Sequence, residues 1–130
     1  MGKIFYLIAG ILIFLGVFLF IFMKSSVNGY PSLENFNGTV DFYRSLSCGC
    51  CTLHENYLRG KLNVKDNQME DLSGIKSKYK IPSELQSCHT AVIGNYFVEG
   101  HIPLEAIDKL IAEKPDIAGI AMPGMPSGSP

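Results

Sequence analysis

The sequence lacks the excess of positive charge that a nucleic-acid-binding protein needs. Its 130 residues include eleven Lys and Arg against twelve Asp and Glu, and two of the lysines, Lys3 and Lys24, flank an apolar segment. The nine basic residues that remain face all twelve acidic ones, so the chain has no basic stripe to meet phosphates. The composition therefore argues against a nucleic-acid partner, and the length leaves room for one modest domain.

Charged residues are also absent from Ile4 to Met23, a run of twenty residues. At about 1.5 Å per helical residue, such a run spans the ~30 Å hydrocarbon core of a bilayer. The segment lacks the small-x-small cleavage site of a secretory signal, and position six lacks the Ser or Thr that myristoylation requires. The sequence therefore predicts an uncleaved transmembrane signal-anchor over residues 1–24, with a membrane as one partner. A weak positive-inside bias predicts an extracytoplasmic location for the rest of the chain.

The segment after the predicted anchor divides into a tether and a domain. Residues 25–38 mix Ser, Asn, Gly and Pro, as a tether does, and residues 39–130 show strand and helix periodicities. The patterns predict, in chain order, a strand over 39–46, a helix over 52–59, a strand over 61–65, a helix over 69–79 behind a cap at Asp66 or Asn67, an antiparallel hairpin over 89–100, an amphipathic helix over 103–114 and an extended tail. This order, βαβ followed by ββα, predicts an α/β fold of the thioredoxin-like type.

Cysteine is scarce, yet three of the four cysteines fall within "SCGCC", where the first predicted strand gives way to a helix. The start of a helix favours thiolate over thiol, so Cys48, Cys50 and Cys51 gain nucleophilicity and metal affinity there. The fourth, Cys88, lies in the loop before the third predicted strand. In a thioredoxin-like domain that loop approaches the first helix, so we expect four sulfur atoms to converge.

Several chemistries are compatible with this cluster. A dithiol oxidoreductase needs only Cys48 and Cys51, which have the required spacing. A structural zinc site usually draws its ligands as two separated pairs, whereas crowded thiolates can bridge soft ions such as Cu(I). Two ordinary disulfides in an extracytoplasmic module that serves a partner would also use an even number of cysteines. The residues alone leave these alternatives open, with Cu(I) favoured by the clustering.

The segments "SCGCC", "IPSELQSCHTAVIGNYFVEGHIP" and "AMPGMPSGSP" closely resemble the CopG-like copper-resistance family, also described as domain-of-unknown-function family 411. The likeness covers residues 38–130, with the motifs in the family's order. It implies a thioredoxin-like fold, an extracytoplasmic setting and copper bound by Cys48, Cys50, Cys51 and Cys88. The chain departs from the family where His54 and Tyr57 stand in place of the usual Trp and His, and where the tail ends before the usual Gly-Met-Glu continuation.

Other side chains could add ligands to the cysteines. His54 shares a helical face with Cys50 and Cys51, and His89 adjoins Cys88. His101 lies in a turn before the last predicted helix, and Met125 offers a thioether suited to Cu(I). Each has a simpler alternative: an exposed polar residue, a capping or turn-stabilising residue, or flexible apolar filler.

The sequence thus predicts a thioredoxin-like metal-binding domain over residues 39–130 that sequesters, carries or redox-buffers one or more Cu(I) ions in copper homeostasis or resistance. Catalysis is not required by this hypothesis, and a copper transporter or copper chaperone is the expected protein partner. The alternative is a thiol–disulfide oxidoreductase that uses Cys48 and Cys51.

Overall fold

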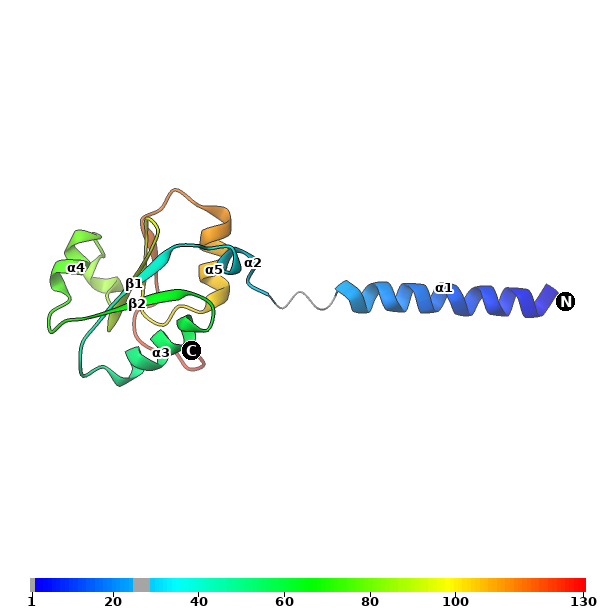
Figure 1. The fold of residues 1–130 in the computed structure, drawn as a ribbon, viewed down its shortest axis with the longest axis horizontal. Coiled ribbons are helices and arrows are strands. Elements are labelled where there is room, and N and C mark those ends of the chain that lie inside the picture. The colour runs from blue at the N-terminus through cyan, green and yellow to red at the C-terminus, as the bar shows by residue number, and fades with distance from the viewer. Residues whose placement is uncertain (1, 25–28) are drawn as a thin grey trace.

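The structure is a computed structural model and describes residues 2–24 and 29–130 (Figure 1). Residue 1 and residues 25–28, the first part of the predicted tether, lie outside the described residues. The helices are α1 (Gly2–Lys24), α2 (Pro31–Glu34), α3 (Gly49–Arg59), α4 (Ser73–Lys78), the 3₁₀ helix η1 (Ser83–Leu85) and α5 (Leu104–Glu113). The strands are β1 (Thr39–Arg44), β2 (Asn63–Gln68), β3 (His89–Ile93), β4 (Tyr96–Glu99) and β5 (Gly119–Ala121).

The strands form one sheet in the order β2-β1-β3-β4-β5. β1 pairs with β2 in parallel, β1 with β3 and β3 with β4 antiparallel, and β4 with β5 in parallel. The mixed α/β fold and the order βαβ followed by ββα are therefore confirmed. The short strand β5 was not predicted, because three residues between two turn-rich segments carry no periodic signal.

Sequence pattern explains the central strands. Val40, Phe42 and Arg44 of β1 alternate as buried residues with less buried neighbours, whereas β3 is buried along its whole length. β3 and β4 are joined by a two-residue turn, in which Gly94 has a φ of +60°. A positive φ at the first central position suits the twist of a tight hairpin, and glycine adopts it without strain. The hairpin brings the segment after β4 back beside the start of β3.

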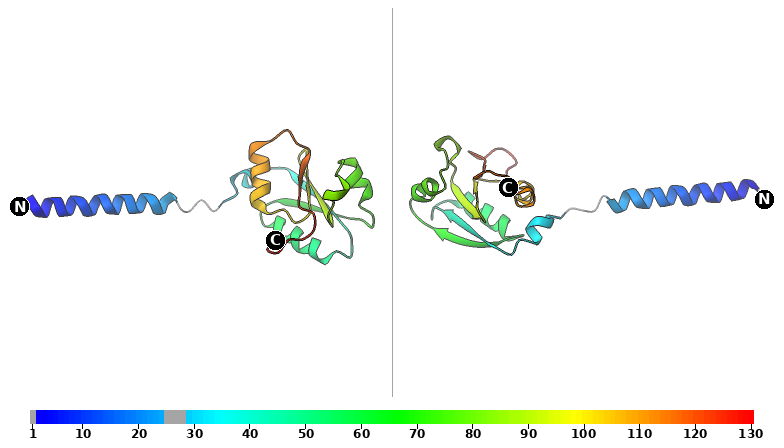
Figure 2. Two further views of the ribbon diagram at one scale, coloured as in Figure 1. Left: turned by 180° about the vertical axis from the view of Figure 1, so that it is seen from behind. Right: turned by 90° about the horizontal axis from the view of Figure 1, so that it is seen from above.

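The helices form layers on the two faces of the sheet. α3 and α5 share one hydrophobic core with inward residues of the strands, including Val40, Phe42, Ala91 and Val98. α4 lies on the other side of the strands from α5 (Figures 1 and 2). Helix α3 therefore packs on the sheet, and its N-terminus lies at the end of the sheet where β1 finishes.

The second part of the predicted tether is ordered on the domain. Pro31, with its φ already suited to a helix, starts α2, and the backbone N–H groups of Ser32 and Leu33 donate to Asp108 Oδ1 of α5 at 2.8 and 3.0 Å. Leu33 is buried in the core. A polar segment can therefore still dock on the domain, because the buried Leu33 side chain and the Asp108 carboxylate hold it in place.

The predicted helix over 69–79 is wrong in its first half. β2 continues to Gln68, so Asp66 and Asn67 lie in a strand paired with Phe42 and Tyr43 and do not cap a helix. The Met69 N–H donates to the Arg44 carbonyl at 3.0 Å and extends this pairing. Pairing with a central strand overrides the low strand propensity of Asp and Asn, and the helix is confined to α4.

The predicted start of the helix over 52–59 also needs correction. α3 begins at Gly49, so two motif cysteines belong to its first turn. Its buried residues include Cys51, His54 and Leu58, while Leu53 is 71% exposed. The buried stripe follows the i, i+3, i+7 spacing of a helix but places a histidine, not a leucine, against the sheet.

The first helix was predicted to cross a membrane. α1 is helical from Gly2 to Lys24. A bilayer core needs about 20 consecutive apolar residues. Within the residues that the structure describes, no helix meets the length and apolarity required for a membrane span. The predicted transmembrane signal-anchor over residues 1–24 is therefore not supported by the structure.

Candidate metal centre

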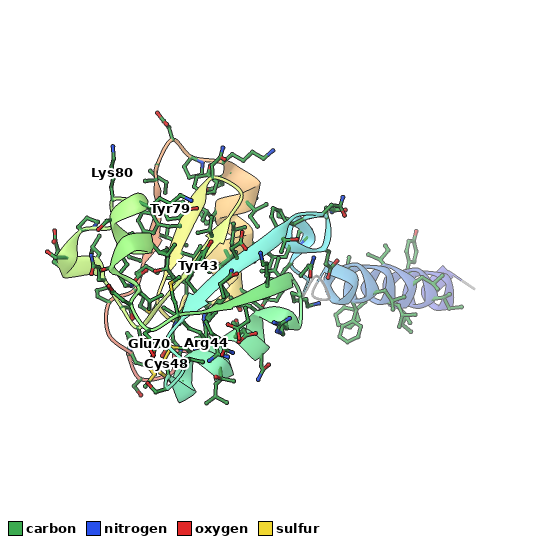
Figure 3. All side chains as sticks on the ribbon, turned by 60° about the vertical axis from the view of Figure 1, so that its left-hand side comes forward. Tyr43, Arg44, Cys48, Glu70, Tyr79 and Lys80 are labelled. Atoms are coloured by element: carbon green, nitrogen blue, oxygen red, sulfur yellow. A yellow bond between two sulfur atoms is a disulfide. The ribbon has the colours of Figure 1, made fainter. Side chains whose placement is uncertain are left out.

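The first three cysteines lie at the N-terminus of α3. β1 ends at Arg44, and the Cys48 N–H donates to the Ser45 carbonyl at 3.3 Å in the turn that follows. The Cys48 carbonyl then accepts the first hydrogen bond of the helix, from the Thr52 N–H at 3.3 Å, which makes Cys48 the N-cap. Arg44 and Cys48 consequently lie at the same end of the sheet (Figure 3).

Two of these cysteines form a disulfide. Cys48 and Cys51 are bonded, with their Cα atoms 5.3 Å apart. Cys50 is a half-buried free thiol whose Sγ lies 3.5 Å from the Cys48 Sγ. The spacing that indicates a dithiol oxidoreductase is therefore realised as a disulfide, with Cys50 beside it as a third sulfur.

Cys88 joins this group from the loop before β3. β3 pairs with β1, so the start of β3 lies at the end of β1 where the cysteine turn begins. The sulfur atoms of Cys48, Cys50, Cys51 and Cys88 all lie within 4.8 Å of one another. The convergence expected from the order of the elements is thus what the structure shows, although Cys88 and Cys51 are 37 positions apart.

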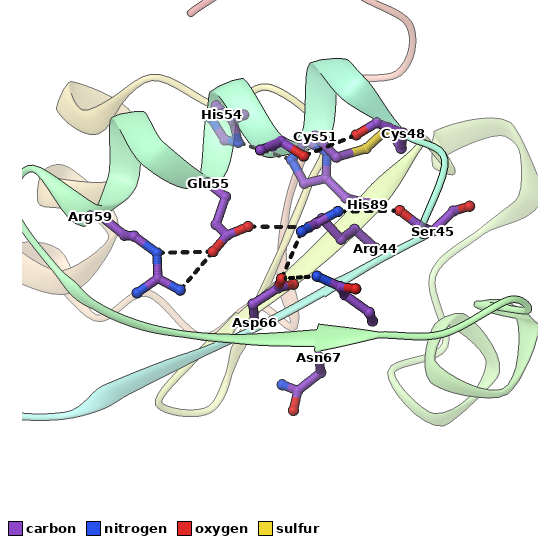
Figure 4. A network of polar contacts seen from close by, with 12 residues as sticks. Arg44, Ser45, Cys48, Cys51, His54, Glu55, Arg59, Asp66, Asn67 and His89 are labelled. Atoms are coloured by element: carbon purple, nitrogen blue, oxygen red, sulfur yellow. Dashed lines mark hydrogen bonds and ion pairs between the residues drawn. A yellow bond between two sulfur atoms is a disulfide. The ribbon is translucent and has the colours of Figure 1, made fainter.

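Two buried histidines lie next to each other behind the cysteine turn, His89 of β3 and His54 of α3 (Figure 4). The Ile102 carbonyl can only accept, so His54 Nε2–H donates to it at 3.0 Å and leaves His54 Nδ1 without a proton in the neutral ring. His89 Nε2–H must then donate to His54 Nδ1, at 2.9 Å. The remaining nitrogen, His89 Nδ1, carries a lone pair and lies 3.4 Å from Cys88 Sγ.

Burial keeps the first two histidines neutral. Loss of solvation in the core lowers the pKa of His54 to about 4 and, with help from the neighbouring imidazoles, the pKa of His89 to about 3. Both rings are therefore uncharged at neutral pH. Neutral imidazole is the form that binds metal ions, so no proton has to be displaced from His89 Nδ1.

His101 contributes a second free imidazole nitrogen. His101 Nδ1–H donates to the Pro130 backbone oxygen at 2.6 Å, so Nε2 carries a lone pair. Among the described residues, His101 Nε2 is buried and has no hydrogen-bond partner. Ligand atoms of Cys88, His89 and His101 also lie within 4.8 Å of one another. A buried imidazole nitrogen without a partner, in a ring that also reaches a thiol, fits a metal-ligating group, because burial without a partner is otherwise costly.

The pKa of the Cys88 thiol is raised, whereas the cysteines at the start of α3 are expected to have lowered pKa values. Although Cys88 is exposed as a residue, partial loss of solvation around its thiol raises the pKa of Cys88, and Cys50 adds to the rise, while the Ser87 hydroxyl, 3.9 Å from Cys88 Sγ, opposes it. Cys88 is therefore a thiol at neutral pH without metal. A soft cation would displace its proton on binding.

The predicted methionine ligand remains a prediction. Met125 is 63% exposed in the C-terminal tail, while Met122 packs against the core and its N–H donates to the Glu99 carbonyl at 2.9 Å. The tail is thus fixed next to the strand that carries Glu99, and Met125 lies three residues beyond this contact.

A charged network beneath the cysteine turn was not predicted (Figure 4). Arg44 Nε donates to Glu55 Oε2 at 3.1 Å and Arg44 Nη2 to Asp66 Oδ2 at 2.7 Å. Arg59 Nη2 donates to the other Glu55 oxygen at 2.6 Å. The only sequence signal was the i, i+4 spacing of Glu55 and Arg59. The network fixes α3 to the edge of the sheet from which the cysteines project.

We expect Glu55→Gln to destabilise the protein by about 3 kcal/mol, because a neutral amide replaces the buried carboxylate that pairs with the Arg44 guanidinium. The side chains of Arg44 and Glu55 are only 9% and 7% exposed. Arg59→Gln is the matched control: its side chain is 44% exposed, and we expect a loss below about 1 kcal/mol. Urea unfolding measures both values, and equal losses would contradict this assignment.

Acidification is expected to destabilise the metal-free protein through His54 and His89. Their pKa values are lower in the folded state than the ordinary value of 6.5. The unfolded chain therefore binds more protons below pH ~6.5, and stability falls by up to about 1.4 kcal/mol per pH unit for each ring. Urea unfolding between pH 7 and 4.5 should show a shallower pH dependence in His54→Phe. Equal slopes in the two proteins would contradict the prediction.

Comparison with known proteins identifies relatives of the chain. A family model described as "Protein of unknown function, DUF411" matches residues 85–130. Two solved structures, "Copper resistance protein copG- Form 1" and "Copper resistance protein copG- Form 2", are each 43% identical to this chain with a TM-score of 0.66. Each match covers 71% of this chain and 74% of the other. No curated protein matches. The chain belongs to the CopG-like copper-resistance family.

Proposed function

We propose that this protein binds Cu(I) through Cys48, Cys50, Cys51 and Cys88, in copper homeostasis or resistance. The observation that carries the proposal is the approach of all four sulfur atoms to within 4.8 Å of one another. Thiolates are soft ligands and select soft cations, of which Cu(I) is one. The two related structures are of a protein named for copper resistance, which supports copper as the cargo. Because a thiolate sulfur can bridge two Cu(I) ions, four such sulfurs can bind more than one ion.

The disulfide decides when the complete ligand set is available. While Cys48 and Cys51 are bonded to each other, only Cys50 and Cys88 are free thiols. Reduction of the bond releases two more thiolates next to these two. Copper binding and the oxidation state of the pair are therefore linked, which is the basis for a redox-buffering role.

Two imidazoles extend the sulfur cluster. His89 Nδ1 is unprotonated and lies 3.4 Å from Cys88 Sγ, and a ring nitrogen of His101 lies within 4.8 Å of the same sulfur, so we propose both histidines as additional ligands. Both ring nitrogens of His54 are engaged, with Ile102 and His89. His54 therefore acts on the metal through His89, because it fixes the tautomer of His89. Residues that hydrogen-bond to metal ligands commonly have this role.

We propose an extracytoplasmic location and a thioredoxin-like domain. A disulfide persists in oxidising compartments, and Cys48–Cys51 supports such a setting. The mixed sheet, with a CxxC-spaced pair at the start of the first helix after β1, supports the fold type. A copper transporter or copper chaperone is the protein partner that this role would require.

A second candidate function is thiol–disulfide oxidoreduction by Cys48 and Cys51. The disulfide between them is the observation that favours it. This function needs neither Cys50 nor Cys88, whereas copper binding through four sulfurs needs both. The two candidates therefore differ in what the loss of Cys88 does.

Titration of the reduced full-length protein with Cu(I) under anaerobic conditions tests the proposal. We expect copper to compete successfully against a Cu(I) chelator and to protect all four thiols from alkylation, because each sulfur is a ligand. The matched control is the same titration with Zn(II), for which the three-plus-one cysteine arrangement is less suited. Unprotected thiols at saturating copper would contradict the four-sulfur site.

A further inference from the structure

A buried ion pair lies on the face of the sheet that α4 covers. Lys76 of α4 is 6% exposed, and Glu99 at the end of β4 is fully buried. The Lys76 ammonium donates to Glu99 Oε1, to the Ser87 carbonyl at 2.9 Å and to Thr90 Oγ1 at 3.3 Å. Thr90 in turn donates to Glu99 Oε2 at 2.5 Å. All three protons of the ammonium are used, so the network is fully satisfied.

The pair binds both polar backbone groups of the residue before Cys88. The Ser87 N–H donates to Glu99 Oε1 at 2.6 Å, and the Ser87 carbonyl accepts from Lys76. On the other side of Cys88, His89 is the first residue of β3 and is held by His54. Cys88 is itself exposed, yet it lies between two residues whose positions are fixed from the interior.

Stability alone does not account for these charges. A buried ion pair loses the solvation of two ions, and apolar residues of similar volume often support a fold equally well. What an apolar pair could not provide is the hydrogen bonds to the Ser87 backbone. The loop from η1 to β3 would then have no interior attachment at Ser87 other than packing.

We propose that Lys76 and Glu99 are positioning residues for Cys88. By fixing Ser87, they set the location of the fourth sulfur relative to the three on α3, so that the ligand set is arranged before metal arrives. Ligand groups held in place by surrounding contacts bind metal more tightly than groups that must be ordered on binding. The inference rests on the proposed copper function and names residues from α4 and β4 as part of that site.

Amide hydrogen exchange of the metal-free protein tests the attachment without copper. In the wild-type protein, the Ser87 amide should exchange slowly, like the amides within β3. In the variant Lys76→Met with Thr90→Val and Glu99→Leu, which leaves no unpaired charge, the Ser87 amide should exchange faster while β1 and β3 are unchanged. Lys78→Met, an exposed lysine on the same helix, is the matched control and should leave exchange unaltered. Rapid exchange of Ser87 in the wild-type protein would overturn the proposal, whether or not the variant folds.

Copper affinity tests the consequence. Competition with a Cu(I) chelator should show a loss of about 10- to 100-fold in the triple variant, the range typical for residues that support metal ligands. In a Cys88→Ser background, the same three substitutions should cause no further loss, because the residues act through Cys88. If the three substitutions lower copper affinity by the same factor in the wild-type background and in the Cys88→Ser background, the pair acts on general stability and the proposal is overturned. If the wild-type protein binds no copper, the proposed function fails, and the exchange experiment still decides whether the pair fixes Ser87.

Discussion

Replacing Cys88 with serine is expected to lower the affinity for Cu(I) by more than the roughly 10- to 100-fold that loss of a supporting residue costs. Of the four cysteines, which all lie in the described part of the chain, Cys88 is the one that comes from outside the α3 turn, and it also belongs to the group with His89 and His101. A serine hydroxyl is a hard donor and does not replace a thiolate for a soft cation. Competition with a Cu(I) chelator on the reduced protein measures the change.

Ser47→Ala is the matched control, because Ser47 is an exposed hydroxyl in the turn just before Cys48. It should leave copper affinity unaltered. If Cys88→Ser binds copper as tightly as the wild-type protein while disulfide turnover by Cys48 and Cys51 also persists, the four-sulfur site is wrong. The oxidoreductase function would then be the better account.

Oxidation of the protein is expected to remove most of its copper-binding capacity. With Cys48 and Cys51 joined, two of the four sulfurs no longer exist as thiolates. Cys50 and Cys88 remain, and partial loss of solvation raises the pKa of the Cys88 thiol, which disfavours its ionised form. Copper retained per protein after desalting, measured before and after treatment with a phosphine reductant, reports the effect. We expect near-complete recovery on reduction.

A variant with Cys48→Ser and Cys51→Ser is the control for this experiment. It cannot form the disulfide and lacks both thiolates, so it should bind copper weakly in either redox state. An oxidised wild-type protein that retains copper as well as the reduced one would contradict the proposed role of the pair. The site would then consist of Cys50, Cys88 and the histidines alone.

The order of elements and the meeting of the four cysteines could be predicted from the sequence, because both follow from strong local patterns. Alternation in β1, the Gly94 turn and the apolar stripe of α5 are short-range signals. Because β1 and β3 are antiparallel neighbours, the turn after β1 and the residue before β3 lie at the same end of the two strands. The approach of Cys88 to the motif cysteines is therefore a consequence of topology.

Features that depend on tertiary contacts could not be predicted. The first turn of α3 consists of Gly49, Cys50 and Cys51, none of which favours a helix, so the sequence predicts a helix start that is three residues too late. The sequence suggests that His54 is an exposed residue or a ligand, whereas its two nitrogens connect Ile102 to His89. The burial of Lys76 requires Glu99, 23 positions later, and no local pattern indicates that pairing.

The most direct test of the central claim is the copper content of the full-length protein, measured by mass spectrometry together with a count of free thiols. The protein would be purified anaerobically after growth with and without added copper. We predict one or more copper ions per chain after growth with copper, with thiols that stay unreactive until a chelator is added. A metal-free protein with a readily reduced Cys48–Cys51 disulfide would contradict the copper site and favour the oxidoreductase.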